Sequence, residues 1–143
     1  MAWKRVVVSV DGSPSSARAL RFAAEEAREH SAELHVLTSY TIPAPPIATA
    51  YGTPPWRDEH EWQADAEAML ATALTEALGD DPGIPVIGQA VEGSAAKVLI
   101  DASARADLLV VGTRGHGGFA GMLLGSVSQH LTAHAACAVT VVR

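Results

Sequence analysis

Short apolar runs alternate with helical patterns along this chain, and the alternation limits the possible folds more than any other feature. The first run, residues 6–10 (VVVSV), is continuous and β-branched, which is typical of a strand covered on both faces. Later runs predict four more strands, at residues 34–37, 85–89, 107–111 and 139–142. Because helical patterns separate the strands, we expect an α/β fold in which helices cover both faces of a parallel sheet. The simplest strand order is 3-2-1-4-5.

Helix signals stand between these runs. Ser13 and Pro14 predict an N-cap and a first helical position directly after the first strand. Further helices are predicted to begin near Trp62, Ser94 and Ser126. Residues 41–56 contain five prolines and suit neither a helix nor a strand, so we expect a long surface loop there. Two interpretations of that loop remain open: a lid over a ligand, or an excursion that touches none.

Length and composition restrict the function further. The 143 residues, 48% of them hydrophobic, suit one domain spanning residues 1–143. A single cysteine and the lack of a long apolar run favour a cytoplasmic protein without a membrane span. The formal charge is −6, and the ten Lys and Arg are scattered along the sequence, which argues against nucleic acid as a partner. Any phosphate ligand must therefore be held largely by backbone N–H groups.

Such N–H groups are expected in the stretch Gly112 to Ser128, which contains six glycines and opens a helix. Glycines let the main chain approach a ligand closely, and the first amides of a helix are unpaired donors that favour anions. The hydroxyls of Ser126 and Ser128 are expected to donate to phosphate as well, and the alternative for Ser126 is an N-cap. The strand order places Asp11 and Gly112 at the carboxyl ends of neighbouring strands, where ligands bind in such sheets. No lysine follows a glycine of this stretch, which excludes a P-loop. The dinucleotide-binding pattern G-x-G-x-x-[GA] that begins at Gly115 is a chance match, because no acidic residue follows at the required distance.

The spacing Gly112-x2-Gly115-x9-Gly125-Ser126 resembles the nucleotide-binding signature of the universal stress protein family. Further matching pieces are Val-Asp11-Gly-Ser after the first strand, Leu34-His-Val36 in the second, Ala-Asp107-Leu-Leu-Val-Val-Gly112 before the loop, and the final valine-rich strand. The resemblance covers essentially the whole chain. It implies a five-stranded, Rossmann-like fold that binds ATP in one subgroup of the family, usually as a homodimer.

The resemblance also implies residue roles. Asp11 and the main chain of Val36 should serve the base and ribose, and Gly112 and Gly115 should approach the ribose and the α-phosphate. The residues expected at the β- and γ-phosphates are Gly125, Ser126, Val127 and Ser128. Gly12 and Ser13 belong to the same site through the turn after the first strand, and Arg114 either reaches phosphate or ribose or lies in solvent. Mg²⁺ is expected to accompany ATP, held mainly by the nucleotide's own oxygens.

Three functions fit these residues. The first is a nucleotide-binding stress-response or signalling module. The second is an enzyme, either a slow ATPase or a phosphate or adenylyl transferase, although no general base with an orienting partner is recognisable. The third is a dimeric interaction protein that does not use nucleotide. We expect the last strand, residues 139–142, to be a sheet edge that pairs with its copy in a homodimer.

Overall fold

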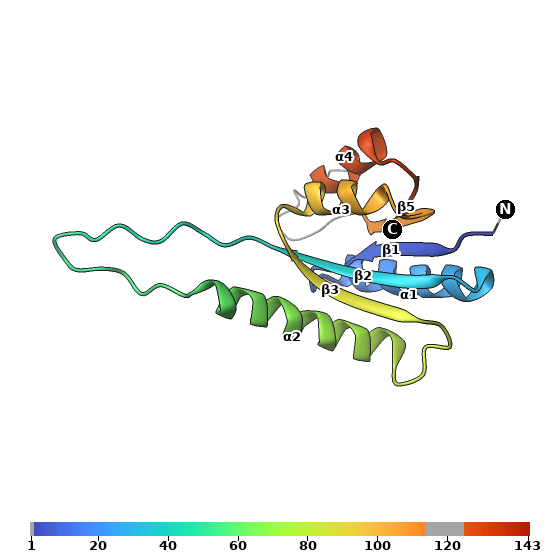
Figure 1. Ribbon diagram of the computed structural model, residues 1–143, viewed down its shortest axis with the longest axis horizontal. Coiled ribbons are helices and arrows are strands. Elements are labelled where there is room, and N and C mark those ends of the chain that lie inside the picture. Colours follow the sequence, from blue (N-terminus) through green and yellow to red (C-terminus); the bar gives the residue numbers. More distant parts are fainter. Residues whose placement is uncertain (1, 114–124) are drawn as a thin grey trace.

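The computed structural model describes residues 2–113 and 125–143. Strands and helices alternate along this chain (Figure 1). In chain order the elements are β1 (Arg5–Ser9), α1 (Pro14–His30), β2 (Glu33–Tyr40), α2 (Glu59–Leu78), β3 (Val86–Glu92), α3 (Ala95–Ser103), β4 (Leu108–Gly112), α4 (Ser126–His134) and β5 (Ala138–Val142). Within the described residues no helix is both long enough and apolar enough to cross a lipid bilayer.

The five strands form one parallel sheet in the order β3-β2-β1-β4-β5, which confirms the predicted topology. The apolar side chains divide into two cores, one on each face of the sheet. Leu20 of α1 and Leu70 of α2 belong to one core, whereas Leu99 of α3 and Leu131 of α4 belong to the other. Helices therefore cover both faces, α1 and α2 on one and α3 and α4 on the other (Figure 1).

Helix α1 begins where the sequence predicts. The Ser13 hydroxyl accepts from the backbone N–H of Ser16 at 3.2 Å, and Pro14 occupies the first turn, where its missing N–H is harmless. Helix α2 begins three residues before the predicted start at Trp62, because Asp58 and Glu61 form a capping box upstream of the apolar pattern.

Strand β2 is longer than predicted and continues three residues beyond Leu37. The polar residues Thr38 and Ser39 interrupt its apolar run, yet they still pair along β3. Thr38 is buried although it is polar, and its hydroxyl is satisfied by donating to the carbonyl of Val10 at 3.1 Å. Strand β2 therefore extends past the end of β1, and the chain leaves the sheet there.

Residues 41–58, here called the arm, connect β2 to α2. The arm projects from the carboxyl edge of the sheet, beyond the first turn of α2 (Figure 1). Apart from an isolated bridge between Thr49 and Gly52 at its tip, it contains neither helix nor strand. Nearly all of its residues are exposed.

Asp107 ties two strands together at the opposite, amino edge of the sheet. Its carboxylate accepts from the backbone N–H groups of Lys4 and Arg5 at 2.8 and 3.0 Å. These two bonds hold the pKa of Asp107 below its usual value. Asp107 therefore stabilises the fold by joining two strands, at the end of the sheet opposite to Asp11.

Candidate functional site

The turn after β1 is held by short-range hydrogen bonds. The Asp11 carboxylate accepts from the backbone N–H of Ser13 at 2.9 Å, and the backbone N–H of Asp11 donates to the Ser16 hydroxyl at 3.2 Å. Gly12 has a φ of +83°, a left-handed conformation that side chains disfavour. Asp11 is half-buried, so its carboxylate occupies a defined position at the carboxyl edge of the sheet.

Gly112 ends β4 next to this turn, in contact with the first turn of α1. A Cβ at this position would lie 2.9 Å from the backbone oxygen of Ser15 and closer still to its hydroxyl oxygen. The sequence links Gly112 to the approach of a ligand. The structure adds a separate reason for glycine, since only a residue without a side chain lets α1 pack this closely on β4.

The amino end of α4 faces the same edge. Gly125 is its N-cap and provides no side-chain hydrogen bond, while Ser126 lies exposed in the first turn. The alternative of Ser126 as an N-cap is therefore wrong. The first amides of a helix have no acceptor within the helix, so the N–H groups of Ser126, Val127 and Ser128 are the donors that the sequence analysis expected here.

Ser128 holds α4 against the sheet. Its buried hydroxyl donates to the carbonyl of Gly112 at 2.6 Å. A second link joins the backbone N–H of Gly125 to the carbonyl of Thr113. The Ser128 hydroxyl hydrogen is thus engaged within the protein, which leaves only its backbone N–H for a ligand, whereas the sequence analysis assigned the hydroxyl to phosphate.

Two of the expected site residues, Arg114 and Gly115, lie outside the described residues. A third, Val36, is described but does not reach the edge. Val36 is fully buried in the sheet, opposite Val8 of β1 and Gly88 of β3. The residues of β2 that come nearer the carboxyl edge are Ser39 and Tyr40.

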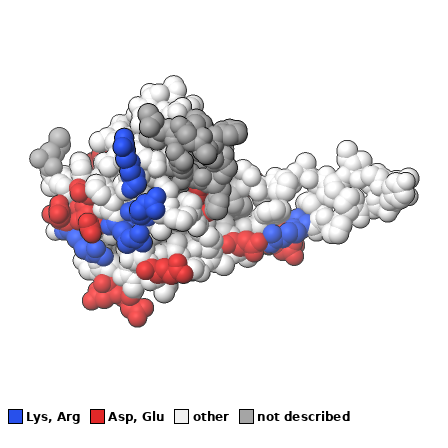
Figure 2. Space-filling model, turned by 180° about the vertical axis from the view of Figure 1, so that it is seen from behind, with Lys and Arg blue, Asp and Glu red and all other residues white. Residues whose placement is uncertain are grey.

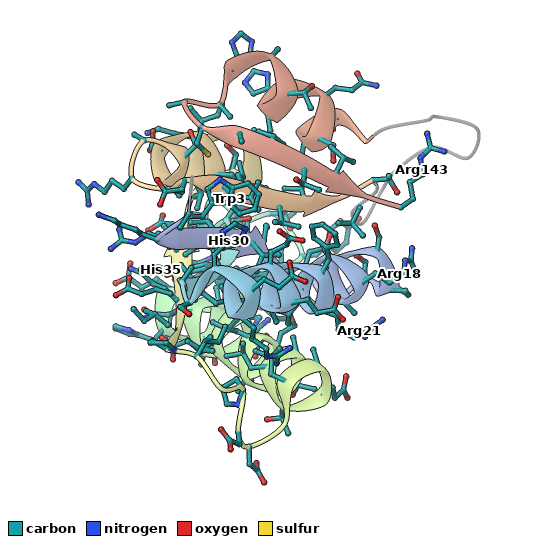
Figure 3. All side chains as sticks on the ribbon, turned by 90° about the vertical axis from the view of Figure 1, so that its right-hand side faces the viewer. Trp3, Arg18, Arg21, His30, His35 and Arg143 are labelled. Carbon is teal, nitrogen blue, oxygen red and sulfur yellow. The ribbon has the colours of Figure 1, made fainter. Side chains whose placement is uncertain are left out.

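Two arginines that the sequence analysis did not include lie near the site. Arg18 follows Ser15 by one helical turn, and Arg143 follows Val142, whose carbonyl accepts from the backbone N–H of Thr113 at 3.1 Å. Figure 3 shows both side chains extending toward the same side of the molecule. The two arginines are far apart in the sequence, so no local spacing could have indicated that the fold places them on the same side of the molecule.

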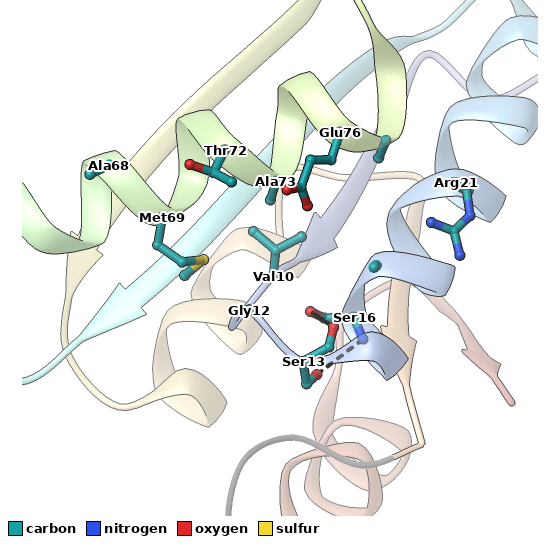
Figure 4. A pocket seen from close by; sticks show the side chains of 12 residues that line it. Val10, Gly12, Ser13, Ser16, Arg21, Ala68, Met69, Thr72, Ala73 and Glu76 are labelled. Atoms are coloured by element: carbon teal, nitrogen blue, oxygen red, sulfur yellow. Dashed lines mark hydrogen bonds between the residues drawn. The ribbon is translucent and has the colours of Figure 1, made fainter.

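A cavity of about 440 Å³ lies between α1 and α2, on the opposite face of the sheet from α4 (Figure 4). Its walls are mainly apolar and include Val10, Met69 and Ala73, while Gly12 and Ser13 form one side. The cavity therefore adjoins the turn after β1, and its volume is within the range of small-molecule sites.

The histidines and the cysteine near the C-terminus do not form a recognisable metal site. The rings of His130 and His134 lie 4.6 Å apart, but no group of three His, Cys, Asp or Glu that could hold a metal occurs among the described residues. The thiol of Cys137 donates to the carbonyl of Ala138 at 3.3 Å. Burial raises the pKa of this thiol, which lowers its reactivity at neutral pH.

Comparison with known proteins identifies the family. Residues 2–143 match the model of the universal stress protein family. The chain belongs to this family. A universal stress protein from Thermus aquaticus is 33% identical over 149 residues, and the match covers 99% of each chain. One from Mycolicibacterium smegmatis is 34% identical over 140 residues, which cover 96% of this chain and 45% of that protein. The chain thus spans about half the length of this protein and of the other curated mycobacterial relatives that it matches.

Solved structures of family members share the fold. A universal stress protein in complex with cAMP is 28% identical, has a TM-score of 0.75, and is matched over 100% of this chain and 99% of that chain. The universal stress protein UspA from Lactobacillus plantarum is 18% identical with a TM-score of 0.78, and again 100% and 99% of the two chains are covered. At such low identity the second likeness concerns the fold alone.

Proposed function

We propose that this universal stress protein binds ATP, or a close adenine nucleotide, at the carboxyl edge of the sheet between the turn after β1 and the amino end of α4. The observation that carries the proposal is the first turn of α4. This turn lacks a side-chain cap, presents backbone N–H donors, and is tied to β4 through Ser128 and Gly112. A helix end of this kind favours a phosphate group.

The proposed roles follow the positions of the residues. The N–H groups of Ser126, Val127 and Ser128 hold the β- and γ-phosphates next to Gly125, while Gly112, Arg114 and Gly115 serve the α-phosphate and the ribose. The Asp11 carboxylate accepts from the ribose hydroxyls, in a turn shaped by Gly12 and Ser13. We place the base near the end of β2, at Ser39 and not at Val36, because Val36 lies deep in the sheet.

The adenine preference is supported by the similar structure at 28% identity, which contains cAMP. We propose ATP, accompanied by Mg²⁺, as the ligand. In it the nucleotide's own phosphate oxygens hold most of the Mg²⁺ coordination. Arg18 and Arg143 lie on the same side of the molecule and are described cations that can offset the remaining negative charge of the ligand.

The cellular role we propose is that of a stress-response or signalling module in the cytoplasm. In this role nucleotide occupancy biases a homodimer that forms through β5, an edge strand of the sheet. Free strand edges readily pair with a second copy. Hydrolysis of ATP by the protein can be tested in the binding experiment below, by measuring the ADP that forms over time.

The first experiment measures the nucleotide released on denaturation of protein purified without added ligand. It is followed by titration with ATP, ADP, AMP, cAMP and GTP. We expect adenine nucleotide in near-stoichiometric amount, or micromolar binding of at least one adenine nucleotide with GTP weaker. An empty protein that ignores all five ligands would refute the proposal and favour an interaction protein that does not use nucleotide.

The Ser126→Asp variant separates binding from folding. A carboxylate in the first turn of α4 interacts favourably with the helix dipole, so the free energy of unfolding should stay equal or rise by about 0.5 kcal/mol. The same carboxylate repels phosphate, so the affinity for ATP should fall at least tenfold. Ser126→Asn has a similar size without the charge and should change the affinity little. Equal affinities of the two variants would exclude phosphate from this helix end.

A further inference from the structure

The cavity between α1 and α2 takes no part in the proposed phosphate contacts. It has a volume of about 440 Å³ and lies on the face of the sheet opposite to α4, whose amino end we assign to phosphate. Since one water molecule takes about 30 Å³ of liquid, the cavity has room for roughly 15 non-hydrogen atoms. It therefore suits a metabolite smaller than a nucleotide.

The inner wall of the cavity is apolar. Val10, which follows β1, is buried there, and Met69 extends from α2 into the space (Figure 4). Ala17 of α1 and Ala73 and Ala77 of α2 also line it, and their methyl groups are too short to close the gap between the two helices. Such a wall favours the hydrocarbon part of a ligand, because binding removes apolar surface from water on both sides.

Two opposite charges line the same cavity. They are Arg21 of α1 and Glu76 of α2, and no other charged residue occurs in the described lining (Figure 4). Both residues are exposed. Neither side chain forms an ion pair or a hydrogen bond, whether with the other or with the rest of the chain that the structure describes. Both charges are therefore available to a molecule in the cavity.

This arrangement of charges selects the charge of the occupant. A simple carboxylate is attracted by Arg21 and repelled by Glu76, and a simple amine meets the reverse. A zwitterion finds an opposite charge at each of its ends. On the face shown in Figure 2, Lys and Arg lie next to Asp and Glu on the body of the molecule, so the surrounding surface adds no strong field of one sign.

We propose that this cavity binds a free α-amino acid with an apolar side chain, of about the size of leucine or methionine. Its carboxylate pairs with Arg21, its ammonium group pairs with Glu76, and its side chain packs against Val10 and Met69. Because both protein charges are exposed, each pair contributes modestly. Burial of the ligand's apolar side chain provides most of the affinity.

The amino-acid site adjoins the proposed nucleotide site without overlapping the phosphate contacts. Gly12 and Ser13 line the cavity, and the backbone N–H of Ser13 also donates to the Asp11 carboxylate at 2.9 Å. The turn after β1 thus forms a wall between the two sites. We expect the protein to hold amino acid and nucleotide together, and the amino-acid site to exist whether or not ATP binds.

An NMR titration of the full-length protein with L-leucine and L-methionine tests the proposal, first without nucleotide and then with saturating ATP. At least one amino acid should bind with a Kd of about 1 mM or lower in both conditions. The largest shifts should occur at the amides of Ala17 and Ala73, with little change in β5. No binding, shifts confined to other elements, or loss of binding in the presence of ATP would overturn the proposal.

Two analogues of leucine test the requirement for both charges. The compound 4-methylpentanoate lacks the ammonium group, and 3-methylbutylamine lacks the carboxylate. Each should bind about fivefold more weakly than leucine, because each loses one ion pair and meets one like charge. If either analogue binds as tightly as leucine, the cavity is not a site for a zwitterion.

Charge variants of the protein locate the two ends of the ligand. Arg21→Gln and Glu76→Gln should each lower the affinity for leucine about fivefold, and both replace exposed residues, so the fold should be retained. Arg105→Gln and Glu67→Gln remove the same charges outside the cavity and should change the affinity by less than about twofold. Equal effects in the cavity variants and their controls would contradict the proposal.

Met69 tests the apolar part of the site. Met69→Ser removes apolar contact and should weaken binding of leucine several-fold, whereas Met69→Leu should keep the affinity close to that of the wild type. ATP affinity, measured without amino acid, should be the same in both variants. An unchanged affinity for leucine in Met69→Ser would place the amino acid outside this cavity.

Discussion

Two connections leave the same carboxyl edge of the sheet and behave in opposite ways. The connection from β1 to α1 consists of a few residues held by Asp11, Ser13 and Ser16 through three hydrogen bonds of 2.9 to 3.2 Å. The connection from β2 to α2 is the arm, whose hydrogen bonds between residues 41 and 56 stay at its own tip. The short connection has a fixed geometry, and the long one exposes the apolar side chains of Ile47, Tyr51 and Trp56.

The cause of the difference lies in the residues. Asp and Ser side chains can accept from backbone N–H groups two or three positions later, so they fold a short connection onto itself. Proline lacks the N–H that such bonds need, and it keeps the arm extended. The following predictions test whether the connection near α1 is rigid and functional while the arm is structurally independent.

The largest expected effect is at Gly112, where α1 packs on the sheet. Gly112→Ala places a Cβ against the backbone of Ser15, which cannot move without shifting the first turn of α1. We expect the free energy of unfolding to fall by about 2–3 kcal/mol, measured by urea denaturation. Gly88→Ala is the control, since its Cβ would meet the end of the Leu74 side chain at 3.1 Å, which can adjust. Equal losses in the two variants would contradict the tight packing at Gly112.

A smaller effect is expected at Ser13, the N-cap of α1. Ser13→Ala removes the acceptor for the Ser16 N–H and should lower stability by about 1 kcal/mol. Because Ser13 also belongs to the turn that positions Asp11, ATP affinity should fall several-fold as well. Ser94→Ala removes the corresponding cap of α3 and should lower stability while leaving ATP binding unchanged. Loss of ATP affinity in both variants would mean that general stability, not this turn, controls binding.

Arg18 should influence ATP affinity but not folding. It has no ion pair or hydrogen bond among the described residues, and it lies one turn from Ser15 near the proposed phosphate site. Arg18→Ala should weaken ATP binding about threefold, which corresponds to about 0.7 kcal/mol, and reduce the salt dependence of binding. Arg21→Ala, one turn further along α1, is the matched control. A larger loss at Arg21 would place the phosphates elsewhere.

Much of this architecture is readable from the sequence, because the alternation of apolar runs and caps reflects local chemistry. The strand order and the Ser13 cap follow from such patterns and are confirmed. The burial of Val36 inside the sheet could not be predicted in this way, because it depends on which residues of β1 and β3 pair with β2. The hydroxyl bond from Ser128 to Gly112 and the placement of Arg18 and Arg143 on one side of the molecule likewise arise only after distant segments pack together.

The smallest effect on stability is expected at the tip of the arm. Ile47→Ser with Tyr51→Ser should change the free energy of unfolding of dilute protein by less than about 0.5 kcal/mol, because both side chains are exposed in a single copy. Urea denaturation at low concentration, where copies are separate, provides this value. A large loss at low concentration would show that the arm supports its own chain, and the contrast with the connection near α1 would then fail.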